Sequence, residues 1–180
     1  MDKQDYYKKY IATIPDFPKK GILFRDITPT LEDPEAFQAV IDEMASIASK
    51  YDFNKIVCAD ARGFLFGAAL GYKLHKGIVC ARKPGKLPRP GHSYSYTLEY
   101  GENTLLLSEG SLEEGDRCLI LDDLLATGGS AVAMIELTKL SKAIPVLAMF
   151  YVELPALNGR EAIKKGKDID VYSLVTFEGE

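Results

Sequence analysis

Residues 119–130 read LILDDLLATGGS: an apolar run, two acidic residues, two leucines and a turn of small residues. The apolar residues 118–121 predict a buried β-strand, and the small residues that follow predict a turn into a helix at 129–142. Glycines let the backbone approach an anion closely, and the free N–H groups at the start of a helix attract negative charge. We therefore expect a phosphate-binding loop between this strand and this helix.

The expected phosphate loop consists of five small residues: Ala126, Thr127, Gly128, Gly129 and Ser130. Its two hydroxyls can add hydrogen-bond donors, although a helix cap is an alternative role for either of them. Asp122 and Asp123 lie beside the loop, where a ribose attached to the phosphate would reach. Carboxylates accept hydrogen bonds from sugar hydroxyls and can help to hold Mg²⁺, directly or through water.

Strands and helices alternate along the rest of the chain. The apolar patterns predict strands at 55–59, 77–81, 93–98, 104–108, 144–152 and 170–175, and helices at 34–51, 63–75 and 158–165. This alternation predicts an α/β fold in which a mostly parallel sheet is flanked by helices, with residues 1–180 in a single domain. Ligands bind such sheets at the carboxyl ends of the strands, and the polar clusters fall there. The P-loop and dinucleotide-binding glycine motifs are missing from the sequence.

Composition narrows the choice of partners and of cellular location. The formal net charge of −4 argues against general binding to nucleic acid, which requires a surplus of positive charge. The polar N-terminus predicts no signal peptide, and the absence of a long uncharged apolar run predicts no membrane span. Cys58, Cys80 and Cys118 each lie in an apolar run, which favours buried free thiols in a reducing compartment. We therefore expect a cytoplasmic protein.

The whole string 119–130 resembles the motif with which type I phosphoribosyltransferases bind phosphoribosyl pyrophosphate (PRPP). Other segments resemble the adenine-specific branch of that family: FPKKGILFRDITP at 17–29, DARGFLFG at 60–67, RKPGKLP at 82–88, SYTLEYG at 95–101, and VEL and NGR at 152–154 and 158–160. The resemblance covers nearly the whole chain from residue 17 onward. It implies the type I fold, with a small N-terminal base-binding hood at about residues 1–30 and a mobile catalytic loop at about residues 83–99.

The resemblance also implies the role of individual residues. The 5′-phosphate would lie on residues 126–130, and the ribose on Asp122 and Asp123. Pyrophosphate would lie on Ala61, Arg62, Arg82, Lys83 and Lys86. Positive charge there would stabilise the leaving group. Adenine would stack on Phe24 and meet backbone groups of Leu23 and Arg25. The expected catalytic residues are Glu99, Tyr100 and Arg62.

The reaction that the resemblance implies is transfer of the phosphoribosyl group from PRPP to N9 of adenine, giving AMP and pyrophosphate in purine salvage. Mg²⁺ would be held mainly by pyrophosphate, ribose and water, with no certain protein ligand. A homodimer and a cis peptide between Asp60 and Ala61 are also implied. Two alternatives remain open: salvage of a 6-oxopurine, and a non-catalytic PRPP sensor that regulates transcription. For the sensor, the 16 residues before the first motif are too few to form a DNA-binding domain.

Two departures from the family pattern affect the pyrophosphate loop and the mobile loop. Ala61 stands where some members carry Ser, which removes a hydroxyl donor, although backbone N–H groups could still serve there. Residues 89–94 read RPGHSY, an unusual choice for the middle of the mobile loop.

Overall fold

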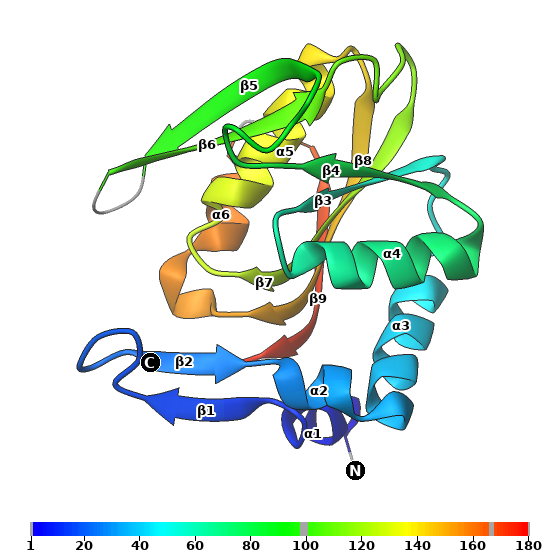
Figure 1. Cartoon of the computed structure of the whole chain (residues 1–180). Helices are drawn as coiled ribbons and strands as arrows, with labels where there is room; N and C mark the ends of the chain where they lie inside the picture. The colour runs from blue at the N-terminus through cyan, green and yellow to red at the C-terminus, as the bar shows by residue number, and fades with distance from the viewer. Residues whose placement is uncertain (1, 98–100, 166–167, 180) are drawn as a thin grey trace.

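The computed structural model describes residues 2–97, 101–165 and 168–179 (Figure 1). Its central layer is a five-stranded sheet in the order β4-β3-β7-β8-β9. The strands are β3 (Lys55–Ala59), β4 (Gly77–Ala81), β7 (Arg117–Leu125), β8 (Ile144–Glu153) and β9 (Asp170–Thr176). All neighbouring pairs are parallel, which confirms the predicted sheet. β7 continues four residues beyond the predicted end at residue 121, because this stretch pairs with the end of β8.

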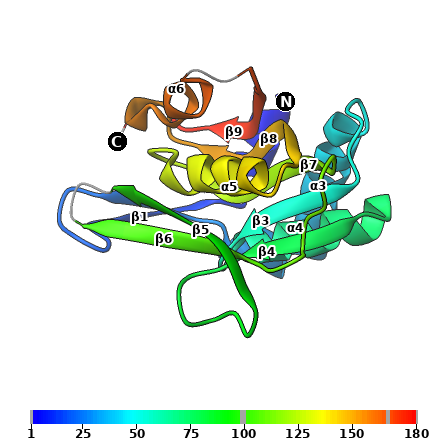
Figure 2. The same ribbon diagram turned by 90° about the horizontal axis from the view of Figure 1, so that it is seen from above.

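Helices cover both faces of the sheet (Figure 2). They are α3 (Pro34–Ala48) and α4 (Gly63–Leu74) on one face, α5 (Gly129–Leu140) on the other, and the short α6 (Gly159–Lys164). Alternation along β8 explains the two cores, because Tyr151 packs with the α3 and α4 side and Phe150 with the α5 side. Within the described residues, none of the helices combines the length and apolar character needed to cross a membrane.

The N-terminal segment forms a small layer of its own, which we call the hood. It contains α1 (Lys3–Lys8), β1 (Ala12–Pro15), β2 (Leu23–Asp26) and α2 (Thr28–Glu32). β1 and β2 form an antiparallel pair. The N–H of Thr176, at the carboxyl end of β9, donates to the Gln4 side chain at 3.2 Å. The hood therefore lies at the carboxyl end of the sheet, as Figure 1 also shows. Its helices and β1 were not predicted, because these short elements bury few residues of their own.

A β-hairpin lies beside α5. It consists of β5 (Pro90–Thr97) and β6 (Glu102–Ser108), paired antiparallel with an irregularity between Pro90 and Ser93. The segment expected as a mobile loop, residues 83–99, therefore contains a regular strand, and its mobility stays a prediction. Glu99 and Tyr100 lie outside the residues that the structure describes.

The hood is attached to the sheet through Tyr151. Its hydroxyl lies 2.9 Å from Thr30 Oγ1, both side chains are buried, and burial raises the pKa of Tyr151 to about 12. We expect Tyr151→Phe to lower the free energy of unfolding by about 1 kcal/mol, because one buried hydrogen bond is lost while the ring still fills the core. Urea denaturation measures this loss. Tyr172→Phe, at an exposed tyrosine, is the control, and equal losses in both variants would contradict this attachment.

Candidate active site

The predicted phosphate loop joins β7 to α5 and lines a small cavity of about 120 Å³ together with Tyr96 from β5. Gly128 immediately precedes α5 and has φ +85°, a left-handed conformation that favours glycine. A Cβ atom on Gly128 would lie 2.7 Å from the carbonyl oxygen of Gly159. The N–H groups of the first turn of α5 have no partner within the helix. Loop and helix start thus present the donors that an anion requires.

The two acidic residues lie side by side and are buried, with exposed fractions of 8% for Asp122 and 5% for Asp123. Asp122 accepts hydrogen bonds from the Asp123 N–H at 2.9 Å and from Ser130 Oγ at 3.3 Å. Burial, and then the charge of Asp123, raise the pKa of Asp122 well above its usual value. Asp123 accepts from Arg62 Nε at 2.5 Å. One carboxylate is therefore neutralised by an arginine, and the other has no cationic partner among the described residues.

A cleft of about 370 Å³ opens at the carboxyl ends of β3 and β7. It is lined by Ala59, Asp60, Ala61, Arg62, Lys83, Tyr96, Asn103, Leu105, Asp122, Asp123, Leu124 and Ser130. The structure therefore brings the predicted ribose residues together with Ala61, Arg62 and Lys83 from the predicted pyrophosphate set. The peptide between Asp60 and Ala61 is cis, which confirms the expectation drawn from the family resemblance.

The other two predicted pyrophosphate residues, Arg82 and Lys86, do not line this cleft. Arg82 Nε lies 3.4 Å and Lys86 Nζ 3.7 Å from Oδ2 of Asp60, whose side chain is almost fully buried. Three of the predicted cations are thus paired with acids: Arg62 with Asp123 at the cleft, and Arg82 and Lys86 with Asp60. An anion that enters the cleft would compete with these carboxylates for the same cations.

Leu23 and Arg25, predicted to meet the base, line a largely apolar cavity of about 440 Å³ beneath the hood. Its other lining residues are Ile22, Thr127, Leu154, Ala156, Leu157, Phe177 and Gly179. Among the described residues β2 pairs only with β1, so its other edge keeps N–H and C=O groups that no strand uses. Phe24 does not line this cavity. Its ring packs 5.2 Å from Phe17 and lies 5.8 Å from the Arg62 guanidinium.

Sequence reasoning missed several residues that line the site. Tyr96 and Asn103 reach the cleft from the hairpin, and a Cβ atom on Gly129 would lie 2.5 Å from the Tyr96 ring. Leu124 lines both the cleft and the phosphate-loop cavity. The alternation of side-chain directions along a strand could have predicted that Tyr96 faces the cleft. Leu124, an apolar residue between the two acids and the phosphate loop, carries no such signal in the sequence.

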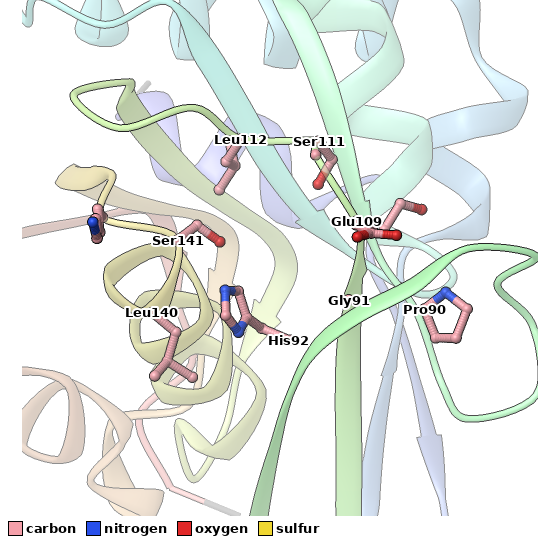
Figure 3. A pocket seen from close by; sticks show the side chains of 11 residues that line it. Pro90, Gly91, His92, Glu109, Ser111, Leu112, Leu140 and Ser141 are labelled. Atoms are coloured by element: carbon pink, nitrogen blue, oxygen red, sulfur yellow. The ribbon is translucent and has the colours of Figure 1, made fainter.

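A separate cavity of about 430 Å³ lies between the base of the hairpin and the carboxyl end of α5 (Figure 3). His92, from the unusual segment at residues 89–94, lies near Leu140 and Ser141 there. None of the predicted site residues lines this cavity, which is at the opposite end of α5 from the phosphate loop. The described part of the predicted site is therefore confined to the carboxyl end of the sheet.

Comparison with known proteins identifies the family to which this chain is similar. The family profile described as "Phosphoribosyl transferase domain" matches residues 30–147. The adenine phosphoribosyltransferase of Pseudothermotoga lettingae is 50% identical over 157 residues, 87% of this chain and 92% of that protein. The crystal structure of the enzyme of the same name from Thermoanaerobacter pseudethanolicus has a TM-score of 0.92 at 44% identity, covering 97% and 99% of the two chains.

A third similar protein is known with ligands. The Saccharomyces cerevisiae adenine phosphoribosyltransferase, complexed with adenine and an imino-altritol bisphosphate, has a TM-score of 0.87 at 34% identity, covering 96% of this chain and 98% of that one. The chain thus belongs to the phosphoribosyl transferase family, the class that its parallel sheet and phosphate loop define. Within that family it is a member of the adenine phosphoribosyltransferases.

The conformation of Gly128 leads to a test of the phosphate loop. We expect Gly128→Ala to weaken PRPP binding at least about a hundredfold, because the new methyl group would displace the loop from Gly159. Isothermal titration calorimetry in the presence of Mg²⁺ measures the affinity. Gly115→Ala is the matched control, since Gly115 has a similar φ of +87° but open space around it. Equal loss of PRPP affinity in both variants would contradict the role of the loop.

Proposed function

We propose that this chain transfers the phosphoribosyl group from PRPP to N9 of adenine, giving AMP and pyrophosphate in purine salvage. One observation carries the proposal: the phosphate loop, the two acids and the Arg62 side of the cleft lie together around the carboxyl end of β7. The sequence identity to adenine phosphoribosyltransferases supports the same reaction. So does the yeast relative, which binds adenine together with a sugar bisphosphate.

In this proposal different residues bind different parts of PRPP. Residues 126–130 hold the 5′-phosphate, and Asp122 and Asp123 accept hydrogen bonds from the ribose hydroxyls. Breaking the bond between C1′ and the pyrophosphate oxygen leaves positive charge on the ribose, which the two carboxylates stabilise. Arg62 and Lys83 hold the departing pyrophosphate. Arg82 and Lys86 exchange their ion pairs with Asp60 for contacts with the pyrophosphate.

The new bond forms between C1′ and N9, and the purine loses a proton. We propose Glu99 as the group that takes part in this proton transfer, with Tyr100 beside it. Closing of residues 83–99 over the cleft would exclude water, which could otherwise attack the ribose. Tyr96 supports this arrangement, because it lies three residues before Glu99 and already lines the cleft.

Mg²⁺ is proposed as the cofactor, and two carboxylates of the site are suited to help hold it. Among the described residues, no group of three or more His, Cys, Asp or Glu could hold a metal ion. Asp122 and Asp123 are nevertheless two adjacent buried carboxylates, and Asp122 has no cationic partner in the part of the chain that the structure describes. They could bind the ion through water or through the ribose hydroxyls, while pyrophosphate supplies its other ligands. When bound, the ion neutralises charge on the leaving group.

Adenine is proposed to bind at β2 in the cavity beneath the hood, with backbone groups of Leu23 and Arg25 at its edge. The free edge of β2 supports this assignment. The predicted stacking on Phe24 does not fit this position, because the Phe24 ring does not line the cavity. Adenine offers an amino donor and an N1 acceptor, whereas a 6-oxopurine offers an oxygen acceptor and an N1–H donor. A fixed pair of backbone groups can match only one of these patterns, which also separates adenine salvage from the 6-oxopurine alternative.

A panel of free bases tests the proposed function. With PRPP and Mg²⁺, we expect kcat/KM for adenine to exceed that for hypoxanthine and guanine at least about a hundredfold, because the wrong base leaves buried polar groups unpaired. Product identification by chromatography accompanies the kinetics. Comparable values for adenine and hypoxanthine would remove the adenine assignment. A lack of turnover with every base would favour the sensor alternative.

The three cysteines bear on the compartment. Cys58, Cys80 and Cys118 are all free, with Cys58 and Cys118 buried and Cys80 partly exposed, which corrects the expectation that all three are buried. Free thiols persist in a reducing compartment. They support our proposal that the protein acts in the cytoplasm.

A homodimer is the proposed assembly, and one face of the molecule supports it. Leu65 and Tyr72 on α4 and Ile78 on the edge strand β4 are large apolar side chains with exposed fractions of 47%, 92% and 41%. An open hollow of about 520 Å³ lies between the two elements. Exposed apolar patches at a sheet edge are typical of surfaces that a second protein covers.

We expect the wild-type chain to sediment at twice the mass of one chain, and Tyr72→Glu to sediment at the mass of one chain at micromolar concentration. The carboxylate would be buried without a partner in the interface, which is costly. Sedimentation velocity provides the measurement. Tyr172→Glu, on β9 at the opposite edge of the sheet, is the control. A Tyr72 variant that sediments like the wild type would exclude this face as the interface.

A further inference from the structure

The segments VEL at 152–154 and NGR at 158–160 resemble the family but have no role in the reaction described above. In the structure an ion pair between a buried carboxylate and a partly exposed arginine joins them. Arg160 donates from Nε to Glu153 Oε1 at 3.0 Å and from Nη2 to Oε2 at 2.5 Å, while Nη1 donates to the Val171 carbonyl at 2.6 Å. Glu153 is only 4% exposed. Two parallel hydrogen bonds give this pair a defined geometry, which a single point charge would lack.

The ion pair closes residues 154–159 into a short loop between β8 and α6. This loop contains the 3₁₀ turn η1 (Pro155–Leu157). Three of its residues, Leu154, Ala156 and Leu157, line the 440 Å³ cavity beneath the hood, which we call the base-side cavity. The Leu154 N–H donates to the Leu125 carbonyl at 2.9 Å, which ties the loop to the last residue of β7. One side of the loop is therefore a wall of the cavity beneath the hood.

The other side of the loop touches the phosphate loop backbone to backbone. A Cβ atom on Gly159 would overlap the Ala126 carbonyl oxygen and lie 2.8 Å from Leu125 Cδ1. A Cβ atom on Gly128 would in turn lie 2.7 Å from the Gly159 carbonyl oxygen. Two glycines thus face each other without a side chain between them. Thr127 lines both the phosphate-loop cavity and the base-side cavity, so the two cavities are adjacent.

We propose that the Glu153–Arg160 pair and Gly159 act as a brace that sets the separation between the phosphate loop and the wall of the base-side cavity. These are positioning residues, because none of them lines either cavity. The brace holds the two halves of a nucleoside monophosphate at the distance that one molecule requires. The inference rests on the proposed function, since it takes the two cavities as the sites of the 5′-phosphate and the purine.

The choice of variants follows from the electrostatics of the ion pair. Burial alone would raise the pKa of Glu153, and the hydrogen bonds from Arg160 hold it below its usual value. Removing one partner leaves a buried charge, whereas replacing both with apolar residues of similar size is often tolerated. We therefore expect the double variant Glu153→Met/Arg160→Met to keep the fold while it removes the hydrogen-bonded geometry. Arg160→Lys keeps the charge and loses the fork of donors.

The experiment compares the affinities for AMP and for ribose 5-phosphate by isothermal titration calorimetry, with thermal unfolding followed in parallel. A misplacement of about 1 Å can lower the rate of an enzymatic reaction about a hundredfold, and we expect a similar scale for the affinity of a ligand that must span both cavities. We therefore expect the double variant to bind AMP about a hundredfold more weakly, with the affinity for ribose 5-phosphate lowered less than about threefold. Arg160→Lys should weaken AMP binding in the same selective way. AMP spans both cavities, whereas ribose 5-phosphate occupies only one.

Arg117→Met is the matched control, because Arg117 also pairs with a carboxylate, that of Asp52 at 3.4 Å, but at the amino end of β7. Its affinity for AMP should equal that of the wild type. The brace is contradicted if AMP and ribose 5-phosphate weaken equally, if neither weakens, or if the Arg117 variant loses AMP affinity to the same extent. Failure of the proposed function is a separate result, seen when the wild type neither binds AMP nor converts adenine.

Discussion

Two carboxylates buried side by side at the carboxyl end of β7 are the constraint on which the rest of the site depends. Burying a charge is costly unless a partner offsets it, and two adjacent acids repel each other. Arg62, immediately before α4, supplies the partner for Asp123. A Cβ atom on Gly63 would lie 2.8 Å from Asp122 Oδ1, so the start of α4 approaches the acids as closely as glycine allows. The acids thereby fix where α4 begins relative to β7.

The same electrostatic requirement explains the arrangement of the cations. Arg62, Arg82 and Lys86 each lie within 4 Å of a carboxylate of Asp123 or Asp60. These pairs hold the cationic side chains near the cleft in the absence of an anion. The Arg62 side chain is 51% exposed, so water screens its ion pair and the partner can be exchanged at modest cost. In the proposed reaction, pyrophosphate carries more charge than a single carboxylate and would draw these cations to itself.

Close backbone packing gives the phosphate loop its shape. The Tyr96 ring lies against Gly129 on one side, and Gly159 lies against Ala126 and Gly128 on the other. Neither contact leaves room for a Cβ atom, because the partner is an aromatic ring or a carbonyl group. The loop is therefore held by the hairpin and by the segment after β8, two parts of the chain that are distant from it in sequence. A loop held in this way is pre-organised, which lowers the ordering cost of binding the phosphate in the proposed function.

The local pattern of apolar and polar residues was sufficient to predict the elements whose own residues show a clear spacing. Apolar runs and glycines correctly predicted the positions of the five sheet strands, of α3 to α6 and of the loop at residues 126–130. Buried strands and amphipathic helices can be predicted in this way because their apolar residues follow a regular spacing in the sequence. The site could be predicted only in part. Phe24 lies near Arg62 and does not line the cavity of Leu23. Arg82 and Lys86 pair with Asp60. Tyr96 and Leu124 line the cleft although the sequence did not predict them there. These placements follow from the direction of side chains on strands that meet only after folding. The sequence by itself determined the sheet, the loop and the acids, whereas the tertiary structure alone decided which cation meets which acid, since such pairs join residues far apart in the chain.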